Sequence, residues 1–240
     1  MVFGDSTATG YGCMSAEEVP GVLIARGLAE RTGGRIRLST KAIVGATSKG
    51  VCGQVDAMFV AGPPPDAAVM MLGANDVTAL NGVGPSAQRL ALTVRRLRTH
   101  GAAVVVGTCP DLGVISAIPQ PLRSLAHART SQLARAQAAS VRAAGGVPVP
   151  LAHLLAPQFR ATPEAMFSAD GYHPSPAAYA LAADALLLAL VDVLSGRDEA
   201  PAPAIPASPA QSGIPVVSRL WRRPEAGSSA PSSYQPVGSD

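Results

Sequence analysis

Apolar runs that alternate with helical patterns constrain this 240-residue chain more than any other feature of its sequence. The clearest runs are residues 67–72 and 102–107, which contain almost no polar side chain. Such a run is typical of a strand that is covered on both faces. Shorter runs at residues 1–3, 36–44 and 146–150 complete the series. Because strands that alternate with helices form parallel sheets wrapped on both sides, we predict a three-layer α/β/α sandwich with a five-stranded parallel sheet.

The segments between these runs predict helices. Ser15 and Glu18 form a capping-box pattern at the start of the first helix, and Pro176 occupies a favoured first-turn position in the last. Apolar residues at helical spacing predict helices at residues 15–31, from Val51 to Gly62, and at 85–100, 122–144 and 176–194. The stretch from 151 to 169, which contains Phe159 and Phe167, is predicted to be less regular than the segments around it.

The composition changes near the end of the last predicted helix. Residues 197–240 are dominated by Pro, Ala and Ser and have almost no apolar periodicity. We therefore predict one folded domain over residues 1–196 and a disordered tail over 197–240. Trp221 lies among three arginines in the tail, and we interpret it as a solvated segment rather than a docking element.

Charge and cysteine content exclude several classes of protein. The net charge is +3, and no basic run is interleaved with aromatic residues, so nucleic-acid binding has no support. Cys13, Cys52 and Cys109 do not have the spacing of metal ligands. Cys13 and Cys52 would meet if their loops were neighbours, but we expect all three to be buried thiols. We predict no metal and no cofactor.

The amino-terminal sequence bears on the cellular location. No signal peptide precedes the first strand, and no apolar stretch looks long enough to span a bilayer, so the chain as written predicts a cytoplasmic protein without a transmembrane segment. However, only three residues precede Gly4, whereas strands usually have about five or six. We therefore expect that the natural start lies upstream, and in that case a secreted or cell-envelope location follows.

Four polar signals fall where strands end or on a loop that can reach those ends. They are Ser6, Gly45, Asn75 and the pair Asp170 and His173. Each has a structural alternative, because glycine forms turns, Asn and Asp cap helices, and a histidine before proline is common in loops. In a parallel sheet, however, ligands bind at the carboxyl ends of the strands, so all four signals are predicted to meet at one edge.

These signals resemble the sequence blocks of the SGNH, or GDSL-type, hydrolases, a family of esterases and lipases. The resemblance covers about residues 1–194. It is carried by Gly4-Asp5-Ser6, by Gly45 in Ala42–Thr47, by Gly73-Ala74-Asn75-Asp76 and by Asp170-Gly171-Tyr172-His173-Pro174-Ser175. The chain departs from the pattern at Val44, where the family often has Asn or Arg, which makes Gly45 the least secure of the matches.

The resemblance implies a flavodoxin-like fold and a set of site residues. Ser6 would be the nucleophile, His173 the base and Asp170 the residue that orients it. The Ser6 N–H, the Gly45 N–H and the Asn75 side-chain amide would form the oxyanion hole. The chemistry agrees, because a serine hydroxyl needs a base to take its proton and an imidazole does so near neutral pH.

We accordingly predict a serine hydrolase that cleaves acyl or acetyl esters of small molecules through an acyl-serine intermediate. Two alternatives remain open: an acyltransferase that uses the same intermediate, and a non-catalytic interaction protein on the same fold. The sequence does not predict the oligomeric state.

Several nearby residues are assigned structural roles. Asp76 is expected to bond local backbone amides rather than to serve as an alternative acid, and Cys109 to be a buried thiol rather than a second nucleophile. The histidines outside the motif, His100, His127 and His153, are interpreted as structural or solvated. The apolar residues after the fourth predicted strand would form an acyl pocket or, as we favour from their type, part of the core; they are Leu112, Val114, Ile115 and Ile118.

Overall fold

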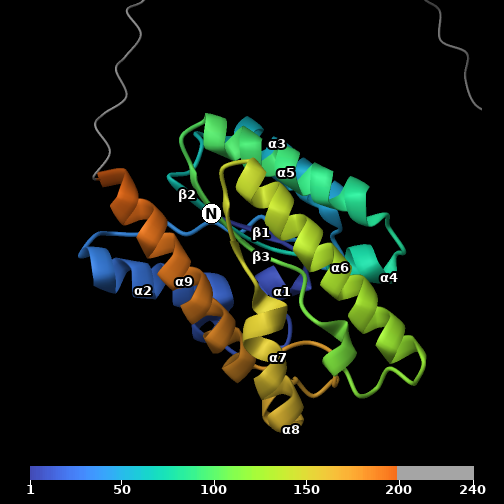
Figure 1. The fold of residues 1–240 in the computed structure, drawn as a ribbon. Helices are drawn as coiled ribbons and strands as arrows, with labels where there is room; N and C mark the ends of the chain where they lie inside the picture. The colour runs from blue at the N-terminus through green and yellow to red at the C-terminus, as the bar shows by residue number, and fades with distance from the viewer. Residues whose placement is uncertain (199–240) are drawn as a thin grey trace, which may run out of the picture. The chain divides into compact units, whose positions relative to one another are not determined.

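The computed structural model describes residues 1–198, and the predicted tail, including Trp221, lies outside the described residues. Within residues 1–198, four parallel strands form one sheet in the order β1-β2-β3-β4 (Figure 1). Their bounds are β1 Val2–Gly4, β2 Ala67–Met71, β3 Ala103–Gly107 and β4 Val147–Val149. Helices cover both faces of the sheet, so the predicted α/β class is confirmed.

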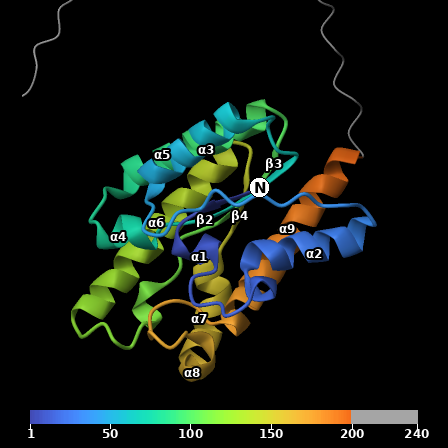
Figure 2. The same cartoon turned by 180° about the vertical axis from the view of Figure 1, so that it is seen from behind.

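Side chains alternate between the two faces of the strands. Phe3, Met70 and Val106 point to one face, where they pack against α3 (Ser48–Ala61), α5 (Val83–Thr99) and α6 (Leu122–Ala143). Val69 and Val105 point to the other face, where they meet α2 (Pro20–Thr32) and α9 (Pro176–Asp198). Figures 1 and 2 show these two helical layers on either side of the sheet. Because both faces are covered, the strands read as apolar runs in the sequence.

The predicted strand at residues 36–44 is the exception, so the prediction of five strands is wrong by one. Thr40 forms only an isolated parallel bridge with Val2, although the backbone of Ser39, Lys41 and Ile43 bonds that of β1. Ile43 and Val44 are more than half exposed. This segment runs along the edge of the short strand β1 and buries little of its apolar surface.

The stretch from 151 to 169 is more regular than predicted. It contains α7 (Leu151–Ala161) and α8 (Pro163–Met166). Pro157 lies inside α7, and a proline there obscures a helical pattern in the sequence. The first predicted helix also begins later than expected, at Pro20, because Ala16–Glu18 forms a separate 3-10 turn, η1.

Helix α9 corrects a second expectation. Residues Pro176–Gly196 are long and apolar enough to cross a membrane by length and composition. In this fold the helix packs on the sheet, and Leu186, Leu187 and Leu190 are almost fully buried there. A helix that packs one side on a sheet meets the same criterion of length and composition.

A helical element begins after each strand at the carboxyl edge of the sheet. These elements are α1 (Ser6–Thr9), α4 (Ala74–Thr78), η2 (Leu112–Val114) and α7, and they follow β1, β2, β3 and β4 in turn. The edge is therefore where the polar signals of the sequence are brought together.

Candidate active site

Ser6 lies at the junction of β1 and α1 and is almost buried. Gly4 ends the strand with φ of 138°, and a Cβ atom there would lie 1.9 Å from the carbonyl oxygen of Met71, so only glycine fits. Asp5 is the N-cap of α1 and accepts a hydrogen bond from the Thr7 N–H at 2.9 Å. As the first helical residue, Ser6 has a backbone N–H outside the intrahelical ladder.

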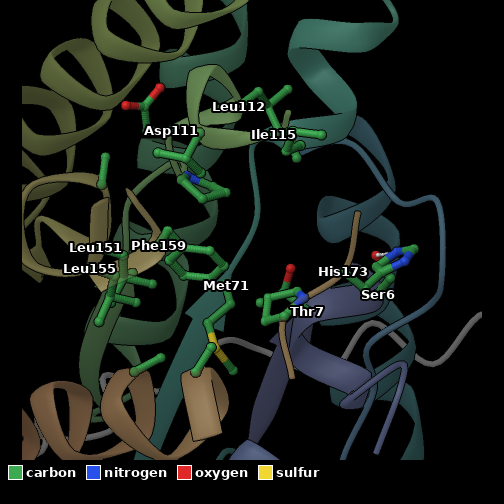
Figure 3. Close-up of a pocket in the computed structure, with 18 of the residues that line it drawn as sticks. Ser6, Thr7, Met71, Asp111, Leu112, Ile115, Leu151, Leu155, Phe159 and His173 are labelled. Atoms are coloured by element: carbon green, nitrogen blue, oxygen red, sulfur yellow. Dashed lines mark hydrogen bonds between the residues drawn. The ribbon is translucent and has the colours of Figure 1, made fainter. Parts of the chain in front are cut away.

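His173 lies beside Ser6, although 167 positions separate them in the sequence (Figure 3). The His173 Nε2 atom is 3.1 Å from the Ser6 Oγ atom. On the other side of the ring, His173 Nδ1 is 2.6 Å from Asp170 Oδ2. The structure thus brings the three residues predicted as a catalytic set into one hydrogen-bonded chain.

The Asp170 carboxylate is surrounded by donors. Although desolvation acts to raise its pKa, the bonds from the His173 ring and N–H, the Tyr172 N–H and the Ser168 hydroxyl lower the pKa of Asp170 well below its usual value. The group is therefore an anion at any pH near neutral, and an anion at this position favours a proton on His173 Nδ1.

Two tyrosine rings flank the imidazole. Tyr11 lies with its ring centroid 4.4 Å from that of His173, and Tyr172 approaches at 5.1 Å in an edge-on arrangement. The Tyr11 backbone is fixed in turn, because its carbonyl accepts a hydrogen bond from the hydroxyl of buried Tyr179 at 2.8 Å. These contacts limit rotation of the ring, and the sequence patterns had singled out neither Tyr11 nor Tyr179.

Asn75 and the segment that contains Gly45 are joined at the edge of the site. Asn75 Nδ2 donates to the Ala46 carbonyl at 3.1 Å, and Asn75 also lines the cavity described below. A side-chain amide has two N–H groups, so one bond leaves the second N–H available. Gly45 precedes Ala46 and has φ of 80°, a left-handed conformation that favours glycine.

Asp76 makes long-range contacts, contrary to the expectation of local backbone bonds. Its carboxylate is 1% exposed and accepts hydrogen bonds from the Ser48 N–H and the Ser48 hydroxyl, both at 2.8 Å. The Ser86 hydroxyl donates at 2.9 Å and the Asn81 amide at 3.0 Å. Asp76 therefore caps the start of α3 from a different element and connects it to α4 and α5.

Two other titratable groups, Asp5 and Cys109, are buried just after the ends of β1 and β3. Burial raises the pKa of Asp5 to about 6, even though bonds from the Thr7 and Gly73 backbone oppose the shift. Burial also raises the pKa of Cys109, which keeps this thiol protonated near neutral pH. The prediction that Cys109 is a buried thiol is confirmed, whereas Cys13 and Cys52 are only partly buried.

A mostly apolar cavity of about 90 Å³ opens beside Ser6 and His173. Leu112, Val114 and Ile115 line it, so three of the four residues that we favoured as core form its wall. Ile118 packs instead against the cluster behind that wall. The opposite wall comes from α7, and Figure 3 shows Leu151, Leu155 and Phe159 there.

The histidines outside the motif differ in their surroundings. His100 and His153 are exposed on the surface, and His100 stacks on Phe59. His127 contacts the wall of the cavity, because its Nδ1 atom lies 2.9 Å from Asp111 Oδ1. Within residues 1–198, no three His, Cys, Asp or Glu side chains are grouped closely enough to bind a metal ion.

Comparison with known proteins identifies the family. The model of the GDSL-like lipase/acylhydrolase family matches residues 2–181. The GDSL-like esterase Rv1075c of Mycobacterium tuberculosis is 72% identical over 238 residues, which cover 96% of this chain and 76% of that protein.

Solved structures share the fold at low identity. A lipase from a goat rumen metagenome, Lip_vut3, superposes with a TM-score of 0.66 at 16% identity and covers 78% of this chain and 95% of its own. The psychrotrophic esterase EstA of a Pseudoalteromonas species superposes with a TM-score of 0.61 at 18% identity, and the match covers 81% of this chain and 97% of EstA.

The chain belongs to the GDSL-like lipase/acylhydrolase family, as its sequence blocks predicted, and it is an ester-hydrolysing enzyme.

Proposed function

We propose that this enzyme hydrolyses small carboxylic esters through a covalent acyl intermediate on Ser6. The observation that carries the proposal is the continuous hydrogen-bonded chain from Asp170 through His173 to Ser6. It has the arrangement of nucleophile, base and orienting carboxylate that defines a catalytic triad.

In the first step, the Ser6 oxygen attacks the ester carbonyl carbon while His173 Nε2 takes the hydroxyl proton. Asp170 stabilises the imidazolium through its bond to Nδ1. The tetrahedral intermediate then collapses, the bond to the alcohol oxygen breaks, and the imidazolium returns the proton to the departing alcohol. In the second step, a water molecule attacks the acyl-serine, again with His173 as base, and releases the carboxylic acid and free Ser6.

The negative charge on the carbonyl oxygen needs fixed donors. We assign this role to the Ser6 N–H, the Gly45 N–H and the Asn75 side-chain amide. The support for Ser6 is its position at the start of α1. Asn75 lines the cavity and donates to the carbonyl of Ala46, the residue that follows Gly45, so a hydrogen bond joins the two segments that carry these donors.

Relatives support an ester as the substrate. The 72% identical relative is named an esterase, and EstA is described as inhibited by monoethylphosphonate. A phosphonate that reacts with a serine hydroxyl reports an activated nucleophile. We infer that Ser6 reacts in the same way.

The proposal is tested by labelling the full chain with a fluorophosphonate probe and mapping the modified peptide. Modification at Ser6, lost in Ser6→Ala and His173→Ala, supports it when nitrophenyl butyrate turnover is lost in parallel. Turnover that persists in folded Ser6→Ala would overturn it. The same assay with added alcohol distinguishes hydrolysis from acyl transfer, because transfer yields a new ester instead of free acid.

A further inference from the structure

The cavity beside Ser6 is bounded by two walls that belong to different elements. One wall, which we call the η2 wall, is formed by Leu112 of η2 and by Ile115 directly after it. Leu155 and Phe159 of α7 form the other wall (Figure 3). Ser6 and His173 lie at one end of the space between them. An apolar cavity that begins at the reacting serine suits the hydrocarbon part of an acyl group.

The η2 wall is anchored mainly to α6. Leu112 and Ile115 pack with Leu133 of α6 in one buried cluster. Asp111, the residue before η2, also accepts a hydrogen bond from the Gly113 N–H at 2.8 Å, which fixes the local turn. These contacts set the shape of the η2 segment but not its distance from α7.

An ion pair connects the two walls. Arg160, near the end of α7, donates from Nη2 to Asp111 Oδ2 at 2.8 Å. The Asp111 carboxylate is 5% exposed, whereas the Arg160 side chain is 55% exposed. The same carboxylate meets His127 of α6 through its other oxygen, at 2.9 Å. Asp111 thus has one partner on α6 and one on α7, and the bond from Arg160 is the one that joins the η2 wall to α7.

We infer that the Asp111–Arg160 ion pair sets the width of the acyl cavity and thereby limits the enzyme to short acyl chains. This inference rests on the proposed function of Ser6. A cavity of 150 Å³ lined by similar side chains binds benzene, which has six carbons. By that measure, the cavity of about 90 Å³ accommodates an acyl chain of about four carbons.

Arg160 is the specificity-determining residue in this arrangement. Without its bond, Val114 still packs near Phe159, but among residues 1–198 no other ion pair joins the η2 wall to α7. Only the apolar contact then holds the two walls together, so they separate more easily and admit a longer chain. Each methylene that enters an apolar pocket contributes about tenfold or more to discrimination, so even a small displacement changes the preferred length.

The test compares Arg160→Met with His127→Gln in the full chain. Arg160→Met keeps the aliphatic stem and removes the donor, whereas His127→Gln alters the other partner of the same carboxylate on α6. For each variant, kcat/KM is measured against acyl chain length with nitrophenyl esters from acetate to decanoate. We expect Arg160→Met to raise the octanoate-to-acetate ratio of kcat/KM by about tenfold. His127→Gln should leave the ratio within about twofold of the parent, since the contact between the walls is intact.

A folding control accompanies these variants. Melting temperatures identify a variant that fails to fold, and Arg160→Gln then replaces Arg160→Met. An unchanged profile in a folded Arg160 variant overturns the inference, as does an equal change in His127→Gln.

A binding measurement separates this inference from the proposed function. Octanoate is titrated calorimetrically into Ser6→Ala, with and without Arg160→Met, so that no turnover is needed. Tighter binding, by about tenfold, in the double variant supports a wider cavity whether or not Ser6 is the nucleophile. Equal affinities would contradict it. Failure of the proposed function would appear separately, as absent labelling of Ser6 in the parent.

Discussion

Asp76 accepts both the backbone N–H and the hydroxyl of Ser48, each at 2.8 Å, across 28 positions of sequence. Asn75 is the neighbour of Asp76, and Ser48 lies three residues after Gly45. The bond between Asp76 and Ser48 therefore lies directly behind the two side-by-side segments that carry the proposed oxyanion donors. A negative charge at the start of α3 is also favoured by the helix dipole.

Removal of the Ser48 hydroxyl should lower kcat while KM stays nearly constant. Ser48→Ala deletes one of the two bonds to Asp76, which loosens the spacing between Gly45 and Asn75. We expect a loss of roughly tenfold in kcat, since a single misplaced donor is worth up to about 3–4 kcal/mol of barrier. Steady-state kinetics with nitrophenyl butyrate measures the change.

Ser86→Ala is the matched control for Ser48→Ala. It deletes a hydroxyl that bonds the same carboxylate, but from α5, away from the site. Both variants should lose about 1 kcal/mol of unfolding free energy in urea titrations. Ser86→Ala should keep the parent kcat, because only Ser48 lies near Gly45. A comparable loss of kcat in both variants would contradict a specific role of the Ser48 bond in positioning the donors.

Asn75→Ala tests the side-chain oxyanion donor directly. The variant removes the amide that lines the cavity, so we expect kcat to decrease by about a hundredfold or more, with a modest change in KM. Asn81→Ala serves for comparison, because its amide bonds Asp76 without lining the cavity. Turnover of Asn75→Ala at the parent rate would exclude this amide from the oxyanion hole.

The site could be predicted where local chemistry sets the backbone. The Gly4-Asp5-Ser6 turn needs a glycine at positive φ and a capping carboxylate, and both requirements are visible in the sequence. The loop from Asp170 to His173 is similar, since the carboxylate bonds the backbone of Tyr172 and His173 within three residues. Short-range patterns of this kind need no knowledge of the tertiary structure.

Contacts between distant elements could not be read in that way. The contact between Asp76 and Ser48 spans 28 positions of sequence, and the contact between Asp111 and Arg160 spans 49. No periodicity in the sequence links either pair. The α7 wall was missed because Pro157 interrupts its pattern. Conversely, the apolar residues at 36–44 predicted a strand, but Ile43 and Val44 stay exposed at the sheet edge. The apolar character of a residue did not by itself show whether the residue lies in the core, in the cavity wall or at the surface.

Asp5 should make the protein less stable as the pH rises from about 4 to 6. Its pKa is about 6 in the folded protein and 3.8 without burial, so in that interval the folded state keeps a proton that the unfolded state has released. The folded state thus binds more protons, and stability decreases with pH until Asp5 ionises in both states. The difference of about two pKa units corresponds to roughly 3 kcal/mol.

Asp5→Asn isolates this contribution. The amide keeps an acceptor for the Thr7 N–H but does not titrate. Urea unfolding of the parent and of Asp5→Asn between pH 4 and pH 7 gives the difference in unfolding free energy at each pH. That difference should shift in favour of Asp5→Asn by roughly 2 kcal/mol between pH 4 and pH 7, because at pH 4 the unfolded state has already released part of its proton. A constant difference would mean that Asp5 has the same pKa in both states.

Gly73 should tolerate no side chain, because it joins β2 to the helix that carries Asn75. Its φ is 136°, and a Cβ atom would lie 2.7 Å from that of buried Cys109. Gly73→Ala should therefore lower the unfolding free energy by about 2 kcal/mol or more through backbone strain and overpacking. Gly84→Ala is the control, since Gly84 lies in α5 with open space around it and should stabilise by about 0.4–1 kcal/mol. Urea titration measures both variants, and equal effects would contradict a special conformation at Gly73.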